Sequence, residues 1–183
     1  ATNPDETPWT SETTKERHTV VLTKALPGMT IKRTFTFGDD YTISVNDIVT
    51  NTGSAPLKLR GIQKLYMAEH DLVDSFTGVA DDKLRELTPA QVAKKDMINY
   101  QTYAGWMGAG TKYWFTAFMQ TQNLQSTILL SKANHGYEMS LSYPVTVIGA
   151  GGKMNRTYLC FCGPKKLDVL EHIRDTKNVR KFD

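Results

Sequence analysis

Between residues 29 and 59 the chain alternates apolar and polar side chains almost without a break. Successive side chains of a β-strand point to opposite faces, so this alternation is typical of strands with one buried and one solvated face. Two short polar interruptions, Gly38-Asp39-Asp40 and residues 51–56, supply residues that tolerate tight turns. The stretch therefore predicts a contiguous antiparallel meander over residues 29–65 that begins with a hairpin of residues 29–37 and 41–49.

Four apolar side chains of this hairpin are expected to point mostly inward. They are Ile31 and Phe35 on the first strand, and Ile43 and Val45 on the second. The residues of each pair are separated by an even number of positions, so each pair lies on one face of its strand.

Short segments of strand-like composition recur along most of the remaining chain. The further expected strands are 19–23, 57–65, 113–119, 127–131, 137–143, 145–148 and 154–162. Residues 67–82 are expected to form a loop, and residues 84–98 fit either a helical turn at 89–95 or a loop with a short strand. Many short strands spaced about 8–12 residues apart favour a mostly β, antiparallel sandwich over an α/β fold.

The C-terminal end is the one part of the chain with a clear helical pattern. Gly163-Pro164 places a proline at the expected helix start, where its missing N–H costs little. Leu167, Leu170 and Ile173 follow at i, i+3 and i+6 and form one apolar stripe. We therefore divide the chain into a polar N-terminal segment (1–16), a β-sandwich (17–162) and a C-terminal helix (163–183).

Composition excludes several classes of protein. A chain of 183 residues with 40% hydrophobic residues is sufficient for one folded domain. A formal charge of +3, with basic and acidic residues interspersed, does not argue for nucleic-acid binding. No apolar run reaches the 18 or so residues of a membrane span, and residues 1–17 do not resemble a signal peptide. We expect a soluble piece of a longer protein.

The sequence contains few groups with the spacing of catalytic or metal sites. The cluster Gly149-Ala150-Gly151-Gly152 lacks the residues of a phosphate-binding or dinucleotide loop and is better explained as a hairpin turn. The four histidines, His18, His70, His135 and His172, show no metal-ligand pairing. Glu69-His70-Asp71 is the one local acid–histidine cluster, and its loop composition suggests surface charge. We expect no catalytic, metal or cofactor site.

The two cysteines and a group of aromatic residues leave alternatives open. Cys160 and Cys162 lie two apart on an expected strand, about 6.5–7 Å between α-carbons, which is poor geometry for a mutual disulfide. Two small buried side chains are the favoured interpretation, and a redox pair or half a metal site is the alternative. Trp106, Tyr113 and Trp114 either belong to the core or line a binding groove.

Three ordered sequence blocks resemble one known family. They are Thr30 to Leu59, then Gly105-Trp106-Met107-Gly108 followed by Lys112-Tyr113-Trp114, and finally Phe161 to Leu170. In order and spacing they are similar to the large periplasmic domain of the bacterial YidC membrane-protein insertase. The resemblance extends from about Trp9 to Asp183.

The resemblance implies a fold and a function. The fold would be a β-supersandwich similar to galactose mutarotase, with a C-terminal α-helix. The parent protein would assist insertion and folding of inner-membrane proteins, with or without the Sec translocon, by protein–protein interaction and not by catalysis. It implies a location at the periplasmic face of the inner membrane, with a membrane helix before this chain and the insertase helices after it.

The implied partners are the Sec translocon and its accessory subunits, nascent inner-membrane proteins, and the protein's own transmembrane core. Gly163, Pro164, Leu167, Leu170 and Ile173 would then form a junction that links the soluble domain to the membrane region. The alternatives are a mutarotase-like carbohydrate-active enzyme, which needs converging carboxylate and histidine side chains, and a sugar- or peptide-binding module.

Overall fold

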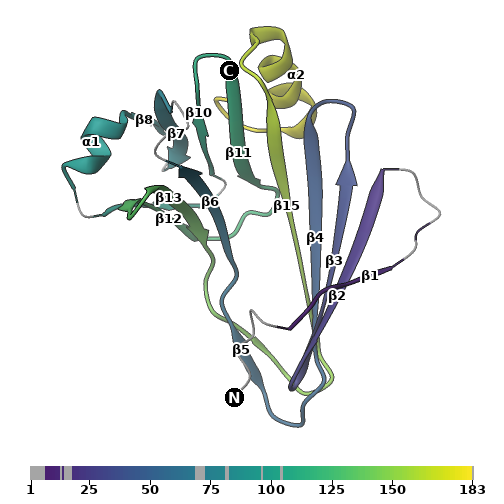
Figure 1. Cartoon of the computed structure of the whole chain (residues 1–183). Coiled ribbons are helices and arrows are strands. Elements are labelled where there is room, and N and C mark those ends of the chain that lie inside the picture. Colours follow the sequence, from purple (N-terminus) through teal and green to yellow (C-terminus); the bar gives the residue numbers. More distant parts are fainter. Residues whose placement is uncertain are drawn as a thin grey trace.

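The computed structural model describes residues 7–12, 14, 18–68, 73–80, 83–95, 97–103 and 105–182. Strands of one large antiparallel sheet run through most of this length (Figure 1). In spatial order they are β1 (Thr10–Glu12), β2 (Thr19–Leu26), β3 (Met29–Phe37), β4 (Thr42–Asn51), β15 (Lys153–Pro164), β11 (Trp114–Gln120), β10 (Trp106–Gly110), β7 (Ser75–Ala80) and β8 (Lys83–Leu87).

Within the described residues, two smaller sheets and two helices complete the fold. The four-stranded sheet has the order β6 (Ile62–Ala68), β13 (Gly136–Ser142), β12 (Ser126–Ala133) and β9 (Ile98–Thr102), and β14 (Thr146–Ile148) pairs with β5 (Leu57–Leu59). The helices are α1 (Pro89–Ala93) and α2 (Leu167–Lys177). The prediction of a mostly β, antiparallel sandwich with a C-terminal helix is confirmed.

The predicted hairpin is present as β3 and β4, with β2 beside β3. The prediction of a contiguous meander over residues 29–65 is wrong for its third strand, which leaves the large sheet. The segment 57–65 divides at Arg60-Gly61 into β5, which pairs with β14, and β6, which pairs with β13. The free neighbour position of β4 is taken instead by β15. Gly61 lies at the division because the Arg156 side chain is close: a Cβ there would be 2.4 Å from Arg156 Nη1.

The prediction of a loop at 67–82 is wrong for residues 67 and 68, which end β6, and for the second half of the segment. Residues 75–80 form β7, with Phe76, Val79 and Ala80 buried, because β7 lies inside the large sheet between β10 and β8. A strand covered on both faces does not need to alternate. Gly78 is required there, since a Cβ would be 2.8 Å from the Trp106 carbonyl oxygen on β10. The helical turn, one of the two alternatives for the next segment, is present as α1.

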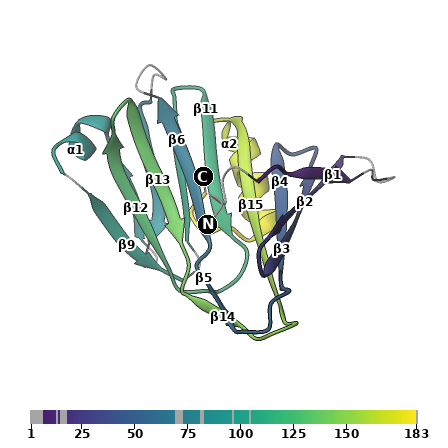
Figure 2. The same cartoon turned by 60° about the horizontal axis from the view of Figure 1, so that its bottom comes forward.

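The part of the large sheet around β7 and β10 is covered on both faces, which creates two hydrophobic cores. Met107 and Ala109 of β10 pack with Ile128, Leu130 and other residues of the four-stranded sheet in the first core. Trp106 of the same strand points the other way, into a second core beneath α2. Figures 1 and 2 show the four-stranded sheet and α2 on opposite sides of the large sheet.

The inward assignment of the hairpin residues is correct for Val45, which is buried. Ile31, Phe35 and Ile43 are only half-buried. The reason is the position of the meander: β2, β3 and β4 contribute no residue to either core cluster. The part of the large sheet formed by β2, β3 and β4 therefore exposes side chains that a fully covered sheet would bury.

Candidate functional site

The C-terminal helix begins at Leu167 and not at Pro164. Strand β15 continues through Gly163 and Pro164, which pair with Phe115 and Trp114 of β11. Gly163 is buried in the sheet, where a Cβ would lie 2.8 Å from the Phe161 ring. The expectation that Gly163-Pro164 starts the helix is therefore wrong, because pairing with β11 extends the strand by two residues.

The apolar stripe of α2 is docked at its centre and exposed at its start. Ile173 is fully buried in the second core, and Leu170 packs against that core together with Val169. Leu167 is 63% exposed. The stripe is thus anchored by two of its three predicted members, and the third is available on the surface.

The helix ends in a turn that sends the chain back to the sheet. Asn178 adopts the left-handed conformation with φ of 54°, and the N–H of Val179 donates to the Arg174 carbonyl. A left-handed residue at this position is a common helix C-cap. Val179, directly after the cap, is buried in the second core.

Aromatic contacts hold the C-terminal tail, residues 178–182, on the sheet. The ring of Phe182 lies 5.0 Å from Trp106, 5.8 Å from Phe115 and 5.4 Å from Phe161, measured between centroids. The indole N–H of Trp106 donates to the Arg180 carbonyl at 2.9 Å. These contacts fix the tail, and Phe182 was not identified as a site residue from the sequence because no periodic pattern reaches it.

A groove of about 370 Å³ lies beside α2 and brings together three of the predicted site residues, Trp106, Leu167 and Leu170. We call it the α2 groove. Its lining comprises Thr77, Leu84, Glu86, Trp106, Phe115, Lys165, Leu167, Leu170, Lys181 and Phe182. Leu84 and Glu86 come from β8, the edge strand of the large sheet. The groove therefore combines an apolar floor with charged side chains and an exposed sheet edge.

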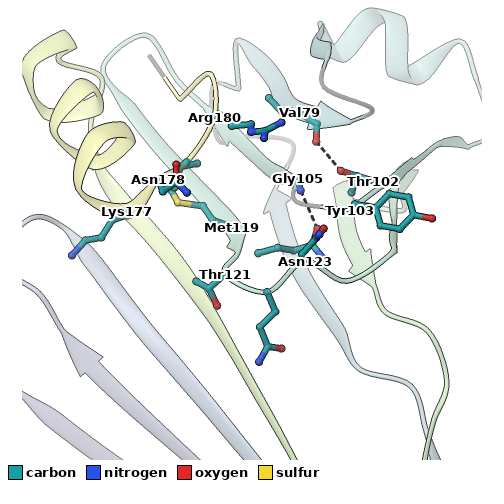
Figure 3. A pocket seen from close by; sticks show the side chains of 13 residues that line it. Val79, Thr102, Tyr103, Gly105, Met119, Thr121, Asn123, Lys177, Asn178 and Arg180 are labelled. Carbon is teal, nitrogen blue, oxygen red and sulfur yellow. Dashed lines mark hydrogen bonds between the residues drawn. The ribbon is translucent and has the colours of Figure 1, made fainter.

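A larger cavity of about 500 Å³ lies on the other side of the tail (Figure 3). Several of its polar groups already have partners within the fold. Gln120 accepts from the Gly105 N–H at 3.0 Å and donates to the Leu124 carbonyl, while Lys177 pairs with Asp40 at 3.1 Å. Figure 3 shows the Lys177 side chain directed away from Gly105. The side chains of Gln120 and Lys177 thus link β11 and α2 to neighbouring loops.

The three aromatic residues predicted as a patch are not on one surface. Trp106 is 3% exposed and belongs to the second core, as the core interpretation requires. Tyr113 and Trp114 are 66% and 56% exposed at the start of β11. The Lys112 ammonium lies over the Tyr113 ring at 5.2 Å from its centroid.

The cysteines share one face of β15, and the structure separates their environments. Burial raises the pKa of the Cys160 thiol to about 12. Cys162 is exposed, with its Sγ 3.5 Å from Thr116 Oγ1. The interpretation as two buried side chains is therefore wrong for Cys162. Both thiols are free.

The histidines of the described residues lie apart from one another. His18 precedes β2, His135 lies in the turn between β12 and β13, and His172 is exposed on α2. Glu69-His70-Asp71 lies outside the described residues. Within the part of the chain that the structure describes, no group of three or more His, Cys, Asp or Glu residues has a metal-binding arrangement. Neither α2 nor α1 has the length and hydropathy of a membrane-spanning helix.

Sequence comparison assigns the family. The sequence model described as the YidC periplasmic domain matches residues 1–183. The chain belongs to the YidC periplasmic domain family. Membrane protein insertase YidC from Zymomonas mobilis is 26% identical over 171 residues, and that from Rhizobium etli is 25% identical over 167 residues. Each alignment covers 85% of this chain but 29% and 28% of the respective relative, so the chain spans less than a third of these YidC proteins.

Structural comparison agrees with the fold expected for a YidC periplasmic domain. A galactose mutarotase related enzyme from Lactobacillus acidophilus superimposes with a TM-score of 0.56 and 9% identity, over 84% of this chain and 70% of the enzyme. At this identity the likeness shows the fold alone. The galactose-mutarotase-like architecture is thereby confirmed for this YidC periplasmic domain.

Proposed function

We propose that the chain is the periplasmic domain of a membrane-protein insertase and that it acts by protein–protein contact. The parent protein would assist insertion and folding of inner-membrane proteins at the periplasmic face of the bacterial inner membrane, with or without the Sec translocon. The partners would be Sec accessory subunits, segments of nascent membrane proteins and the protein's own transmembrane core. Family membership supports this assignment.

The α2 groove is the observation that carries the proposal. The tail is held by the Phe182 ring and the Trp106–Arg180 hydrogen bond, so the position of α2 relative to the sheet is fixed. Leu167 remains exposed beside this fixed element, on the wall of a groove with an apolar floor. Exposed apolar groups on a rigid support are typical of surfaces that bind another protein.

Contact is favoured over a mutarotase-like activity by the placement of the titratable groups. Such an enzyme would need histidine and carboxylate side chains that converge in a cleft. Among the described residues, no histidine lines any of the five cavities characterised for this fold. A sugar- or peptide-binding module would use an aromatic-lined groove. Trp106, Phe115 and Phe182 line the α2 groove, whereas Tyr113 and Trp114 lie outside the five cavities.

The test compares two surface variants of the full-length protein. Leu167→Asp puts a charge on the wall of the α2 groove, and Val147→Asp is the matched control, since Val147 is 59% exposed on β14, within the small sheet far from α2 (Figures 1 and 2). We expect Leu167→Asp to reduce insertion of a model membrane protein at equal expression, and Val147→Asp to insert like wild type. If Leu167→Asp inserts the model protein as well as Val147→Asp and wild type do, the α2 groove has no part in insertion.

The non-catalytic mode has its own test. Polarimetry of the purified domain with galactose and glucose should show interconversion of anomers at the spontaneous rate. A saturable acceleration of this interconversion by the wild-type domain, abolished by a substitution of one of its residues, would establish the enzyme alternative.

A further inference from the structure

Three charged side chains stand in one row across the large sheet. In the antiparallel register Arg33 of β3 lies opposite Asp47 of β4, and Asp47 lies opposite Arg156 of β15. Asp47 accepts two hydrogen bonds from Arg33, at 2.6 Å from Nε and 2.8 Å from Nη2. This bidentate pair uses both oxygens of the carboxylate. Arg156, on the other side of Asp47, donates no hydrogen bond to this carboxylate from its Nε or Nη1, and Asp47 acts on it through charge alone.

Arg156 is nevertheless buried. It is 7% exposed, and its Nε and Nη1 atoms have no hydrogen-bond partner within the described part of the chain. The guanidinium carbon lies 4.3 Å from the centroid of the Tyr143 ring, and burial lowers the pKa of Arg156 from its ordinary value. A buried cation with one aromatic contact and no hydrogen bond is costly unless an anion or polar group compensates it.

Arg156 lines a cavity of about 190 Å³ in which Asp47 is the one acid among the described lining residues. We call it the arginine cavity; it lies between β3, β4 and β15 on one side and the segment from Leu59 to Gln63 on the other. Its charged lining consists of three arginines, Arg33, Arg60 and Arg156, and one acid, Asp47, which is already paired. The site therefore carries an excess of positive charge.

Apolar side chains flank the charged row. Two residues further along the same strands, Ile31, Val49 and Met154 occupy one neighbouring row and line the cavity. Tyr158 of β15 lines it on the other side of the row. A ligand that fits this lining carries one negative group next to an apolar group.

We propose that the arginine cavity binds a carboxylate carried on an apolar group, with Arg156 as its charge partner. A free alkyl carboxylate and the C-terminal carboxylate of a peptide share this chemistry. The proposal does not depend on the insertase function, because it concerns the charge and shape of one cavity on the face of the sheet opposite to α2.

The experiment follows backbone amide shifts by NMR as the chain is titrated with hexanoate, hexanamide, inorganic phosphate and an acetylated Ala-Leu dipeptide in carboxylate and amide forms. We expect saturable shifts around the arginine cavity with hexanoate, with the dipeptide carboxylate, or with both, and weak or no shifts with the amides. Binding of the dipeptide carboxylate alone would identify a peptide terminus as the source. Equal binding of phosphate would show that any anion suffices and would overturn the apolar part of the proposal.

Substitutions separate this role from a purely structural one. Arg156→Met keeps an unbranched apolar side chain and removes the charge, so we expect affinity for the carboxylate to fall about tenfold or more. The folded domain should be retained, since replacing an unpaired buried cation by an apolar side chain is often neutral or stabilising. A thermal shift on adding ligand, present in wild type, should disappear in the variant.

Arg85→Met is the matched control. Arg85 also has a buried Nε without a partner and lies over an aromatic ring, that of Tyr100 at 5.3 Å, but it lines a different cavity of only about 20 Å³. The Arg85→Met variant should bind the carboxylate with the affinity of wild type. The proposal is overturned if no carboxylate gives saturable shifts, or if Arg156→Met binds as tightly as wild type.

Discussion

Asn51 joins two turns that are nearly a hundred residues apart in the sequence. Its amide nitrogen donates to the carbonyls of Ala55 at 2.8 Å, Ile148 at 2.9 Å and Gly149 at 3.1 Å, and its oxygen accepts from the Gly53 N–H at 2.9 Å. The side chain is 1% exposed. One buried amide therefore satisfies backbone groups of the turn after β4 and of the turn before β15.

Asn51→Ala should lower the free energy of unfolding by about 2–4 kcal/mol, because it leaves several buried backbone groups without a partner. Asn51→Asp should cost a similar amount, since a carboxylate cannot donate to the three carbonyls. Urea unfolding of the purified domain measures both. Asn99→Ala, at an exposed position of β9, is the control and should change stability by less than about 0.5 kcal/mol.

The two cysteines should differ strongly in reactivity with a thiol reagent. At pH 8 the Cys160 thiol remains protonated, because burial raises its pKa to about 12, whereas Cys162 is exposed. The thiolate is the reacting species. We expect one rapidly labelled thiol per native chain, lost in Cys162→Ser and kept in Cys160→Ser, and two in urea. Two rapid thiols in the native protein would contradict the burial of Cys160.

At the scale of elements, local pattern predicted the hairpin of β3 and β4 and the existence of α2 but not where β15 ends. Alternation and turn residues encode β3 and β4 directly. The continuation of β15 through Gly163 and Pro164 depends on pairing with β11, which no local signal reports. Strand β7 was missed for a related reason: it is buried from both sides and carries a glycine where β10 approaches.

Local sequence pattern predicted part of the candidate site as well. Leu170 and Ile173 follow from helical periodicity, and both pack on the second core. The α2 groove also depends on Phe182, Leu84 and Lys165, which lie outside any periodic segment and meet only in the folded chain. Arg156 could not be recognised because its lack of a partner depends on the register of three strands.

The attachment of the tail makes a prediction at this scale. Phe182→Ala should reduce stability by about 3–5 kcal/mol, as expected for removing a buried aromatic ring. Trp106→Phe removes the hydrogen bond to Arg180 and part of a buried indole ring, so it should cost more than the roughly 1 kcal/mol of the hydrogen bond alone. Phe37→Ala, at a residue 42% exposed on β3, should cost clearly less than Phe182→Ala. Equal losses for Phe37 and Phe182 would mean that the tail is not held as described.

At the scale of the whole molecule, one sheet is shared by two cores. Strands β7 and β10 send alternate side chains into the core under the four-stranded sheet and into the core under α2. If either core loses its packing, one face of these shared strands is exposed and the sheet on which the other core packs is weakened. The two cores should therefore unfold together, as in a single cooperative domain.

Two substitutions, one in each core, test this coupling. Leu141→Ala in the first core and Phe161→Ala in the second both remove fully buried side chains and should each lower stability by about 2–5 kcal/mol. In a chain with Trp9→Phe and Trp114→Phe, fluorescence reports Trp106 in the second core, while far-UV circular dichroism reports all strands. If the sheet couples the cores, either substitution shifts both signals to the same lower midpoint. A Leu141→Ala chain whose dichroism transition separates from the Trp106 transition would show that each face of the sheet unfolds independently.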